Sequence, residues 1–320
     1  MSIGLALQRM FPLRWERRRT FRLPTGAPLE PYPIEWSAGP PPEGEGWEAQ
    51  AFDAAGVLLI DGRYNPVDIA QFALTCFQRR PQTFLKQADF LRDAQRLDGG
   101  YPYEIALPPY GAASGWLSAM AQGEAASVLL RAFWTTDDRR YADAALRALE
   151  PLLRDVRDGG VSFLRGNDVF FEEVAVDPHH ILNGHLFAAF GLWEAIRAGV
   201  ADAPLIALHD RAVDTLLRWL PDFDSGGWSC YDLAVDERGE RHLAPLGYHH
   251  FHIAQLRVYA VMTGRAAFAK QADRWEAALR EKSVRRRVWS YGAYWLLNAI
   301  QRKAQHSRPN VWHSIDRTPT

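Results

Sequence analysis

The feature that most constrains the fold is a long series of amphipathic helical segments that begins at Pro66. Proline stands at the first helical position there, and apolar residues follow at the spacing of one helix face. Further segments of this kind lie near 82–97, 115–135, 138–155, 180–198, 204–220, 249–263, 265–282 and 288–302. Few β-branched runs interrupt them, so the pattern predicts a mainly α-helical protein.

A loose internal repeat accompanies these segments. Helical segments are followed by glycine pairs at Asp98-Gly99-Gly100, Asp158-Gly159-Gly160 and Ser225-Gly226-Gly227. The glycines suit helix C-caps, and their spacing of about 57–67 residues leaves room for two helices and their connections. Because repeated helical hairpins bury their faces only against neighbours, we expect about four of them to form an α/α barrel (toroid) over residues 66–320. The loops after the glycine pairs would then gather at one mouth.

We expect residues 1–65 to form an N-terminal arm and linker. The stretch 23–48 is rich in proline and glycine, which excludes a helix interior, and 47–59 suits a short hairpin. Arginines precede this stretch, interleaved with Phe11, Trp15 and Phe21: Arg9, Arg14, Arg17, Arg18, Arg19 and Arg22. The alternatives are a solvated basic tail, or peripheral contact with an acidic membrane surface or a substrate chain.

Bulk composition excludes several classes of protein. The formal net charge of −1 gives no overall field for nucleic acid, so an acidic substrate would need a local basic patch. Cys76 and Cys230 are too few and too far apart for a disulfide framework or a CxxC site. No run approaches the roughly 18–20 apolar residues of a membrane span, and the start lacks a convincing secretion signal. We therefore expect a cytoplasmic protein. If it associates with a membrane, we expect the contact to be made by the basic N-terminus.

Three loop regions are dense in polar and aromatic residues: 101–123, 167–184 and 226–255. Each follows one of the glycine pairs. Polar clusters at equivalent places of a repeat favour a shared site over scattered surface positions.

Two kinds of chemistry are open from these loops alone. His249, His250 and His252, with two histidines upstream, invite a metal site, but their spacing matches no known zinc motif, and we favour no metal. Glu172 and Glu173 resemble a carboxylate pair for glycoside hydrolysis. That chemistry needs two carboxylates on either side of the scissile bond, which adjacent residues rarely provide, so Asp177 or Asp232 would have to be the partner.

Several of these segments resemble the catalytic C-terminal domain of the D-glucuronyl C5-epimerases. The block 115–125, GWLSAMAQGEA, is similar to the family's GWYSAMAQGQA. Glu172-Glu173 precedes Leu182-Asn183-Gly184 as the family's EEY precedes its LNG. Tyr231-Asp232-Leu233 resembles the family's YDL, and residues 248–256, YHHFHIAQL, resemble its YHTTHINQL. The order and approximate spacing agree from about residue 85 to 280.

The resemblance implies a helical barrel, a uronic-acid polymer as substrate, no required organic cofactor and a homodimer. It also implies that Glu173, Tyr231 and Tyr248 are the catalytic residues that exchange the C5 proton. We expect Tyr248 and Glu173 on opposite faces of the sugar ring, with Tyr231 bonded to the substrate. The expected substrate-binding residues are Trp116, Gln122, Asn183, Asp232, His249, His252, Arg238 and Arg241.

Two departures from the family pattern bear on the substrate. Val174 stands where the family's EEY has its tyrosine, and Ala234 stands where its YDLRH has an arginine. Arg238 or Arg241 would have to replace that arginine from the same loop. These changes weaken the expectation of heparosan as substrate and leave another uronan or a lipid-linked sugar.

Three other functions compete with epimerisation. A polysaccharide lyase begins with the same proton abstraction and then expels the 4-linked sugar. A hydrolase on a similar helical barrel is the next alternative. A non-catalytic glycan-binding or assembly protein would keep the site and lose the chemistry, as the changes at Val174 and Ala234 suggest.

Overall fold

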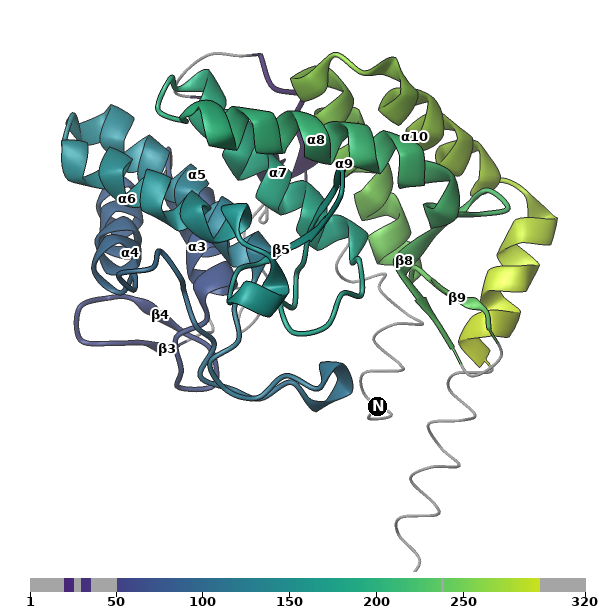
Figure 1. Cartoon of the computed structure of the whole chain (residues 1–320), viewed down its shortest axis with the longest axis horizontal. Helices are drawn as coiled ribbons and strands as arrows, with labels where there is room; N and C mark the ends of the chain where they lie inside the picture. The colour runs from purple at the N-terminus through teal and green to yellow at the C-terminus, as the bar shows by residue number, and fades with distance from the viewer. Residues whose placement is uncertain (1–19, 26–29, 36–50, 237–238, 294–320) are drawn as a thin grey trace, which may run out of the picture.

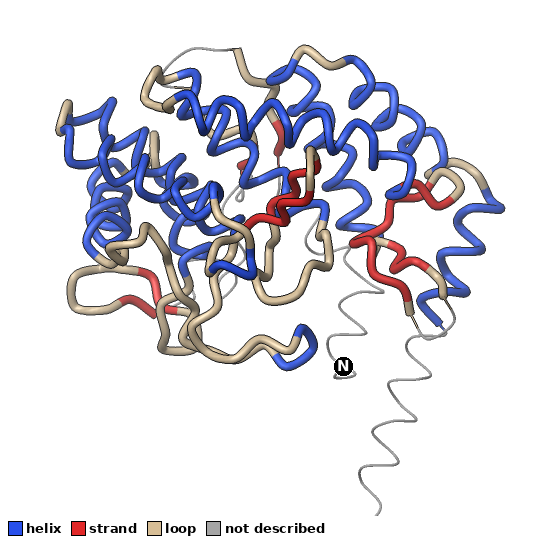
Figure 2. Tube along the Cα trace, in the orientation of Figure 1, coloured by secondary structure: helices blue, strands red, loops and turns tan. Residues whose placement is uncertain are grey.

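The protein is mainly helical, with short strands in the connections between helices (Figures 1 and 2). The structure is a computed structural model that describes residues 20–25, 30–35, 51–236 and 239–293. This confirms the mainly α fold class. Arg238 and most of the basic N-terminal residues lie outside the described residues.

The α-helices come in consecutive antiparallel pairs that match the expected hairpins. The pairs are α3 (Pro66–Cys76) with α4 (Pro81–Asp93), α5 (Ala119–Thr136) with α6 (Arg139–Leu149), α7 (Leu182–Arg197) with α8 (Ala203–Trp219), and α9 (Leu246–Thr263) with α10 (Ala266–Ala278). Helical residues 282–293 follow. Helices start where the sequence predicts: Pro66 begins α3, and the Asn65 side chain accepts hydrogen bonds from the backbone N–H groups of Val67 and Asp68.

The first helix of each pair lies inside and the second outside. Helices α3, α5, α7 and α9 form a row in which each packs against the next, and each also packs against its own partner (Figure 1). The inner helix α5 is buried on all sides from Ala119 to Ala132, whereas the outer helix α6 buries one face only. This alternation explains why the outer helices show the clearer amphipathic pattern in the sequence.

The glycine pairs do not cap the α-helices, so that prediction is wrong. Helices α4, α6 and α8 end at right-handed residues, and short 3-10 helices or turns precede the glycines. Gly159, for example, has φ of 77° and ends a 3-10 helix. The 3-10 helices are η2 (Pro108–Tyr110), η3 (Glu150–Leu153), η4 (Val156–Asp158) and η5 (Leu220–Phe223).

The strands form small antiparallel sheets. They are β1 (Thr20–Phe21) with β2 (Ile34–Glu35), β3 (Ala51–Phe52) with β4 (Leu58–Leu59), β5 (Ser162–Arg165) with β6 (Asp168–Phe171), and the three-stranded β7 (Asp224–Ser225), β8 (Trp228–Val235) and β9 (Arg241–Leu243). The β3–β4 pair is the predicted hairpin. Tyr32, Ile34, Val57 and Leu58 belong to the same buried cluster as the helices, so the N-terminal region contributes to the main core.

Two glycines allow α5 and α7 to cross at very short range. A Cβ on Gly123 would lie 2.5 Å from the Cα of Ala188, and a Cβ on Gly191 would lie 2.1 Å from the carbonyl oxygen of Gly123. Further along, a buried ion pair joins the same helices, with Arg131 Nη2 2.7 Å from Glu194 Oε1. The crossing therefore combines backbone contact with a paired charge.

None of the helices in the described part of the chain is both long and apolar enough to cross a membrane.

We expect Gly191→Ala to lower the free energy of unfolding by at least about 2 kcal/mol, because the added methyl group has no room between the two helices. Gly199→Ala is the matched control. Gly199 has φ of 68°, and a Cβ added there would have no atom within 4 Å. Gly199→Ala should therefore lower the free energy of unfolding by about 1 kcal/mol, from backbone strain alone. Urea unfolding followed by circular dichroism measures both. Equal losses in the two variants would contradict the close crossing.

Candidate active site

The three polar loops predicted from the sequence meet in one region. Ala112 from the first loop and Val174 and Ile181 from the second form a small buried cluster, and Trp116 and Tyr231 pack against it. The backbone N–H of Leu233 also donates to the carbonyl of His179, which ties the second loop to β8 (3.1 Å). The long connections that contain these loops lie in the lower half of Figure 1. The loops therefore lie together as expected, and a shared site among them stays a prediction.

Glu173 lies just after β6, against the first turn of α7. Asn183 Nδ2 donates a hydrogen bond of 2.9 Å to Glu173 Oε2. A Cβ on Gly184 would lie 2.4 Å from Glu173 Cβ and 2.6 Å from Oε2, so only glycine leaves room for this carboxyl group. Two residues of the Leu182-Asn183-Gly184 sequence therefore contact the Glu173 side chain directly.

The environment of Glu173 favours a proton on its carboxyl group. Burial raises the pKa of Glu173 to about 7, the Asn183 hydrogen bond opposes the rise, and the nearby Asp232 carboxylate adds to it. Both protonation states are therefore populated near neutral pH. A group of this kind can take up and release a proton without a large free-energy penalty.

Glu172, its neighbour, has different partners and a structural role. Its Oε2 accepts hydrogen bonds from the backbone N–H groups of His179 (3.3 Å) and His180 (3.0 Å), and its Oε1 lies 2.7 Å from His180 Nδ1. The side chain is 1% exposed. Glu172 therefore holds the 177–180 loop, and the two adjacent glutamates have separate hydrogen-bond partners.

Tyr231 and Tyr248 meet edge to face. Their ring centroids are 5.0 Å apart with an interplanar angle of 87°. Tyr231 is part of β8 and packs on the cluster that contains Val174, the residue after Glu173. Tyr248 lies in the first turn of α9 and is 38% exposed. These contacts bring the three predicted catalytic residues into one region.

The β8–β9 hairpin supplies charge beside the tyrosines. Asp232 is buried and lies 3.0 Å from His242 Nδ1, and its Oδ1 accepts from the Ala234 N–H. The Arg241 guanidinium donates to the carbonyl of Leu233. Arg241 therefore contacts the backbone at Leu233, next to Ala234. Ala234 occupies the position at which the family's YDLRH motif has an arginine.

Trp116 contributes an aromatic surface to the first loop. Its ring stacks on Tyr103 with centroids 4.0 Å apart and planes 8° apart, and its Nε1 donates to the Ile105 carbonyl (2.9 Å). The preceding Gly115 has φ of 97°, a conformation that favours glycine. Flat aromatic surfaces of this kind suit the apolar faces of sugar rings.

Gln122 lies in the core, where the structure offers no support for a substrate contact. Its Oε1 accepts from the Tyr101 N–H (3.0 Å), and its Nε2 donates to the carbonyls of Gly99 (2.8 Å) and Ala148 (2.6 Å). The side chain is 0% exposed. Gln122 joins α5 to two neighbouring turns.

His249 and His252 are also buried. The His249 ring stacks on Trp228 at 3.8 Å, its Nδ1 accepts from the Ser229 N–H, and its Nε2 lies 3.3 Å from the Trp275 carbonyl. His252 Nδ1 lies 3.0 Å from Ser229 Oγ. Burial lowers the pKa of both histidines to about 3, so both are neutral. Their contacts fasten α9 to β8, and a substrate contact by either one stays a prediction.

The histidines of this region are therefore dispersed among core contacts. Within the described ranges, no three His, Cys, Asp or Glu side chains are grouped so that they could hold a metal ion.

One residue near the site was not singled out from the sequence. Glu124 is fully buried on α5, and Gln71 Nε2 donates to both of its oxygens at 3.2 Å. Burial raises the pKa of Glu124 well above its usual range, and the carboxylates of Asp68 and Glu173 add to the rise. The signal was present in the sequence, because Glu124 replaces a glutamine of the family block.

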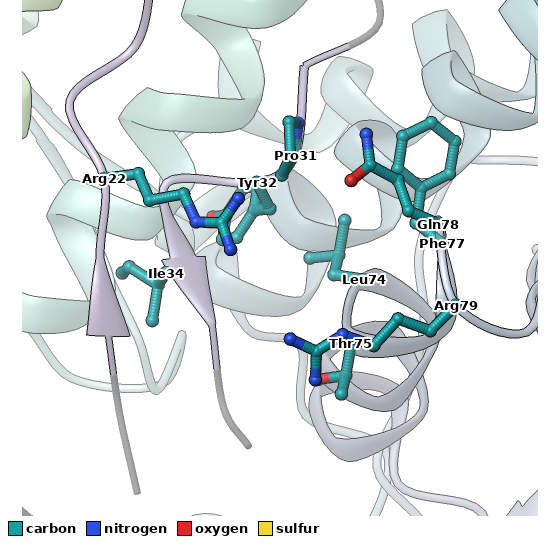
Figure 3. A pocket seen from close by; sticks show the side chains of 9 residues that line it. All are labelled: Arg22, Pro31, Tyr32, Ile34, Leu74, Thr75, Phe77, Gln78 and Arg79. Atoms are coloured by element: carbon teal, nitrogen blue, oxygen red, sulfur yellow. The ribbon is translucent and has the colours of Figure 1, made fainter. Parts of the chain in front are cut away.

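A separate small cavity of about 40 Å³ lies between the N-terminal strands and α3 (Figure 3). It is lined by Arg22, Pro31, Tyr32, Ile34, Leu74, Thr75, Phe77, Gln78 and Arg79. It includes none of the predicted site residues and has room for a few water molecules.

Comparison with known proteins agrees with the resemblance. The family model described as D-glucuronyl C5-epimerase C-terminus matches residues 95–277. A Caenorhabditis elegans protein named D-glucuronyl C5-epimerase is 33% identical over an alignment of 225 residues that covers 62% of this chain and 35% of the nematode protein. An uncharacterized protein of Methanocaldococcus jannaschii is 28% identical over 179 residues, which are 54% of this chain and 56% of that protein. The chain thus spans about a third of one relative and about half of the other.

The two adjacent glutamates should respond oppositely to substitution. We expect Glu172→Gln to lower the free energy of unfolding by roughly 2 kcal/mol, because it disrupts charge-assisted hydrogen bonds that hold the loop. Glu173→Gln should instead raise it at pH 7 to 8 by up to about 3 kcal/mol, because it removes an ionisable group from a buried position.

The pH dependence separates this effect from a change in packing. Glutamate in the unfolded chain titrates near ~4.3, and Glu173 in the folded chain titrates near 7, so the folded state binds the extra proton between these values. The protein therefore loses stability as pH rises through this range. The increase in the free energy of unfolding caused by Glu173→Gln should vanish below about pH 4. If urea unfolding shows the same increase at every pH from 4 to 8, the pKa of Glu173 is not raised.

Proposed function

The chain belongs to the D-glucuronyl C5-epimerase C-terminus family, and we propose that it inverts C5 of D-glucuronyl residues in a polysaccharide or lipid-linked glycan. The observation that carries this proposal is the environment of Glu173. Its carboxyl group is buried, titrates near neutral pH and lies in the same region as Tyr231 and Tyr248. Proton transfer at a carbon next to a carboxylate needs groups of this kind.

The reaction moves one proton away from C5 and returns one to the opposite face. The C5–H bond is only weakly acidic, so negative charge that develops on the substrate carboxylate must be stabilised by hydrogen bonds or a cation. In the proposal, Glu173 acts on one face of the ring and Tyr248 on the other, while the Tyr231 hydroxyl binds the substrate. One group takes the C5 proton and the other donates its own, so the product differs only in configuration.

The substrate carboxylate needs a cationic partner, and we assign this role to Arg241. Its guanidinium contacts the Leu233 carbonyl, beside the position of the missing arginine. Asp232 with His242 and the Trp116 ring complete the proposed binding surface. Because Val174 and Ala234 replace a tyrosine and an arginine of the family pattern, we propose a uronan other than heparosan, or a lipid-linked sugar.

We also propose that the helix pairs continue into an α/α barrel with the loop region at its mouth. The alternation of inner and outer helices along the row from α3 to α9 supports this arrangement. The division of the chain at residue 65, a homodimer, a cytoplasmic location and membrane contact through the basic N-terminus stay predictions.

Solvent exchange at C5 tests the reaction. Incubation with glucuronic-acid polymers, heparosan among them, in deuterated water should place deuterium at C5, as measured by NMR or mass spectrometry. We expect Glu173→Gln and Tyr248→Phe each to lower the exchange rate by about 10²-fold or more. Tyr141→Phe is the matched control, because Tyr141 lies on the outer helix α6 and is bonded to Asp89; it should leave the rate unchanged.

The same experiment separates the competing functions. Ultraviolet absorbance from unsaturated uronate products would identify a lyase and reject epimerisation as the sole activity. Binding of a uronan without any deuterium at C5 would identify a non-catalytic glycan-binding protein.

A further inference from the structure

Asn183 has one satisfied and one unsatisfied side-chain group. It is the second residue of α7, its side chain is 3% exposed, and its Nδ2 donates to Glu173 Oε2 at 2.9 Å. Its Oδ1 is buried and accepts no hydrogen bond from any described residue. A buried acceptor without a donor is uncommon, and it calls for an explanation in terms of another state of the site.

The backbone of Asn183 is held by a contact with α9. The Asn183 carbonyl accepts a hydrogen bond of 3.2 Å from Gln255 Nε2 on α9. Gly184, the next residue, is in contact with the Glu173 side chain. With the backbone held in this way, rotation of the amide about its last side-chain bond is the smallest movement that changes the Glu173–Asn183 contact.

A carboxamide matches both protonation states of a carboxyl group. An ionised carboxylate has only acceptors and needs the N–H donor of the amide, whereas a protonated carboxyl group carries an O–H that needs an acceptor. Half a turn of the amide exchanges Nδ2 for Oδ1 at the same place. The acceptor that is unused in the observed state would then receive the proton of Oε2–H.

We propose that Asn183 is a positioning residue for Glu173: its amide donates to the ionised carboxylate and, after rotation, accepts from the protonated carboxyl group. The role of this pair in catalysis rests on the proposed function, whereas the contact itself does not. Asn183 thereby keeps the carboxyl group in one place while its proton comes and goes.

The hydrogen bond from the Asn183 amide matters because the other polar groups around Glu173 disfavour its ionised form. Asp232 faces it from β8, and Glu124 on α5 and the Tyr103 phenol of the first loop interact with it electrostatically. These groups are acidic or phenolic and disfavour a second negative charge. Among the groups that act on the pKa of Glu173, Asn183 is the one that lowers it.

The test is a titration of Glu173 in the whole protein without substrate. Glutamate labelled with ¹³C at the side-chain carboxyl reports each midpoint by NMR, and Glu173→Gln identifies the resonance. We expect Asn183→Leu to move the Glu173 midpoint up by about one pH unit, because the hydrogen bond to the ionised carboxylate is stronger than the one from the neutral carboxyl group. The near-isosteric Asn183→Asp should move the midpoint further, because two carboxylates then share one site. Asn167→Leu, at an exposed asparagine in the β5–β6 turn, should leave the midpoint unchanged.

A second readout follows the amide itself. The Asn183 side-chain ¹H–¹⁵N resonances of the unaltered protein should titrate with the midpoint of Glu173, because the amide contacts that carboxyl group directly. An unchanged Glu173 midpoint in a folded Asn183 variant, or amide resonances that ignore pH, would overturn the proposal.

Activity is a separate arm. With a uronan that exchanges C5 deuterium, Asn183→Leu should shift the limb of the kcat profile that reports Glu173 to higher pH by about one unit with little change in KM. If the midpoint moves in the titration but no uronan exchanges, the proposed function fails while the positioning role stands.

Discussion

The crossing of α5 and α7 is the contact on which the rest of the structure depends. Gly123 and Gly191 bring the two inner helices together, and the starts of both helices then lie beside the end of β6. The backbone N–H of Ala119, at the start of α5, donates to the Glu172 carbonyl, while Glu173 lies against Gly184 of α7. The position of the candidate proton-transfer group thus follows from helix packing, because a wider crossing would separate the two ends that hold it.

Charge near Glu173 is mostly negative, and this has a consequence for any acidic substrate. Asp232 already raises the pKa of Glu173, and a uronate carboxylate would act in the same direction unless a cation offset it. Binding of such a substrate and protonation of Glu173 are therefore linked. In the proposed function, Arg241 on the neighbouring strand β9 would weaken this linkage by offsetting the charge of the substrate carboxylate.

Helix positions and their pairing could be predicted from the sequence, because proline starts and 3.6-residue periodicity are local signals. The meeting of the loops followed from the repeat. The orientation of side chains on the inner helices could not be predicted in this way: α5 and α7 are buried on all sides, so no polar face distinguishes Gln122 in the core from Asn183 beside the site. Two of the glycine pairs do not cap α-helices because short 3-10 helices, which have no clear periodic signal, follow α6 and α8.

The departures at Val174 and Ala234 affect a different part of the site from the proton-transfer group. Val174 packs in an apolar cluster with Ala112 and Ile181, whereas Glu173 is held by Asn183 and Gly184, none of which is altered relative to the family motif. In the proposed function, loss of a tyrosine hydroxyl and a guanidinium would change which polar groups of a glycan are recognised. The Glu173–Asn183 pair does not depend on either of them. Within the proposed function, the two changes would therefore alter substrate recognition, while the Glu173–Asn183 pair stays in place.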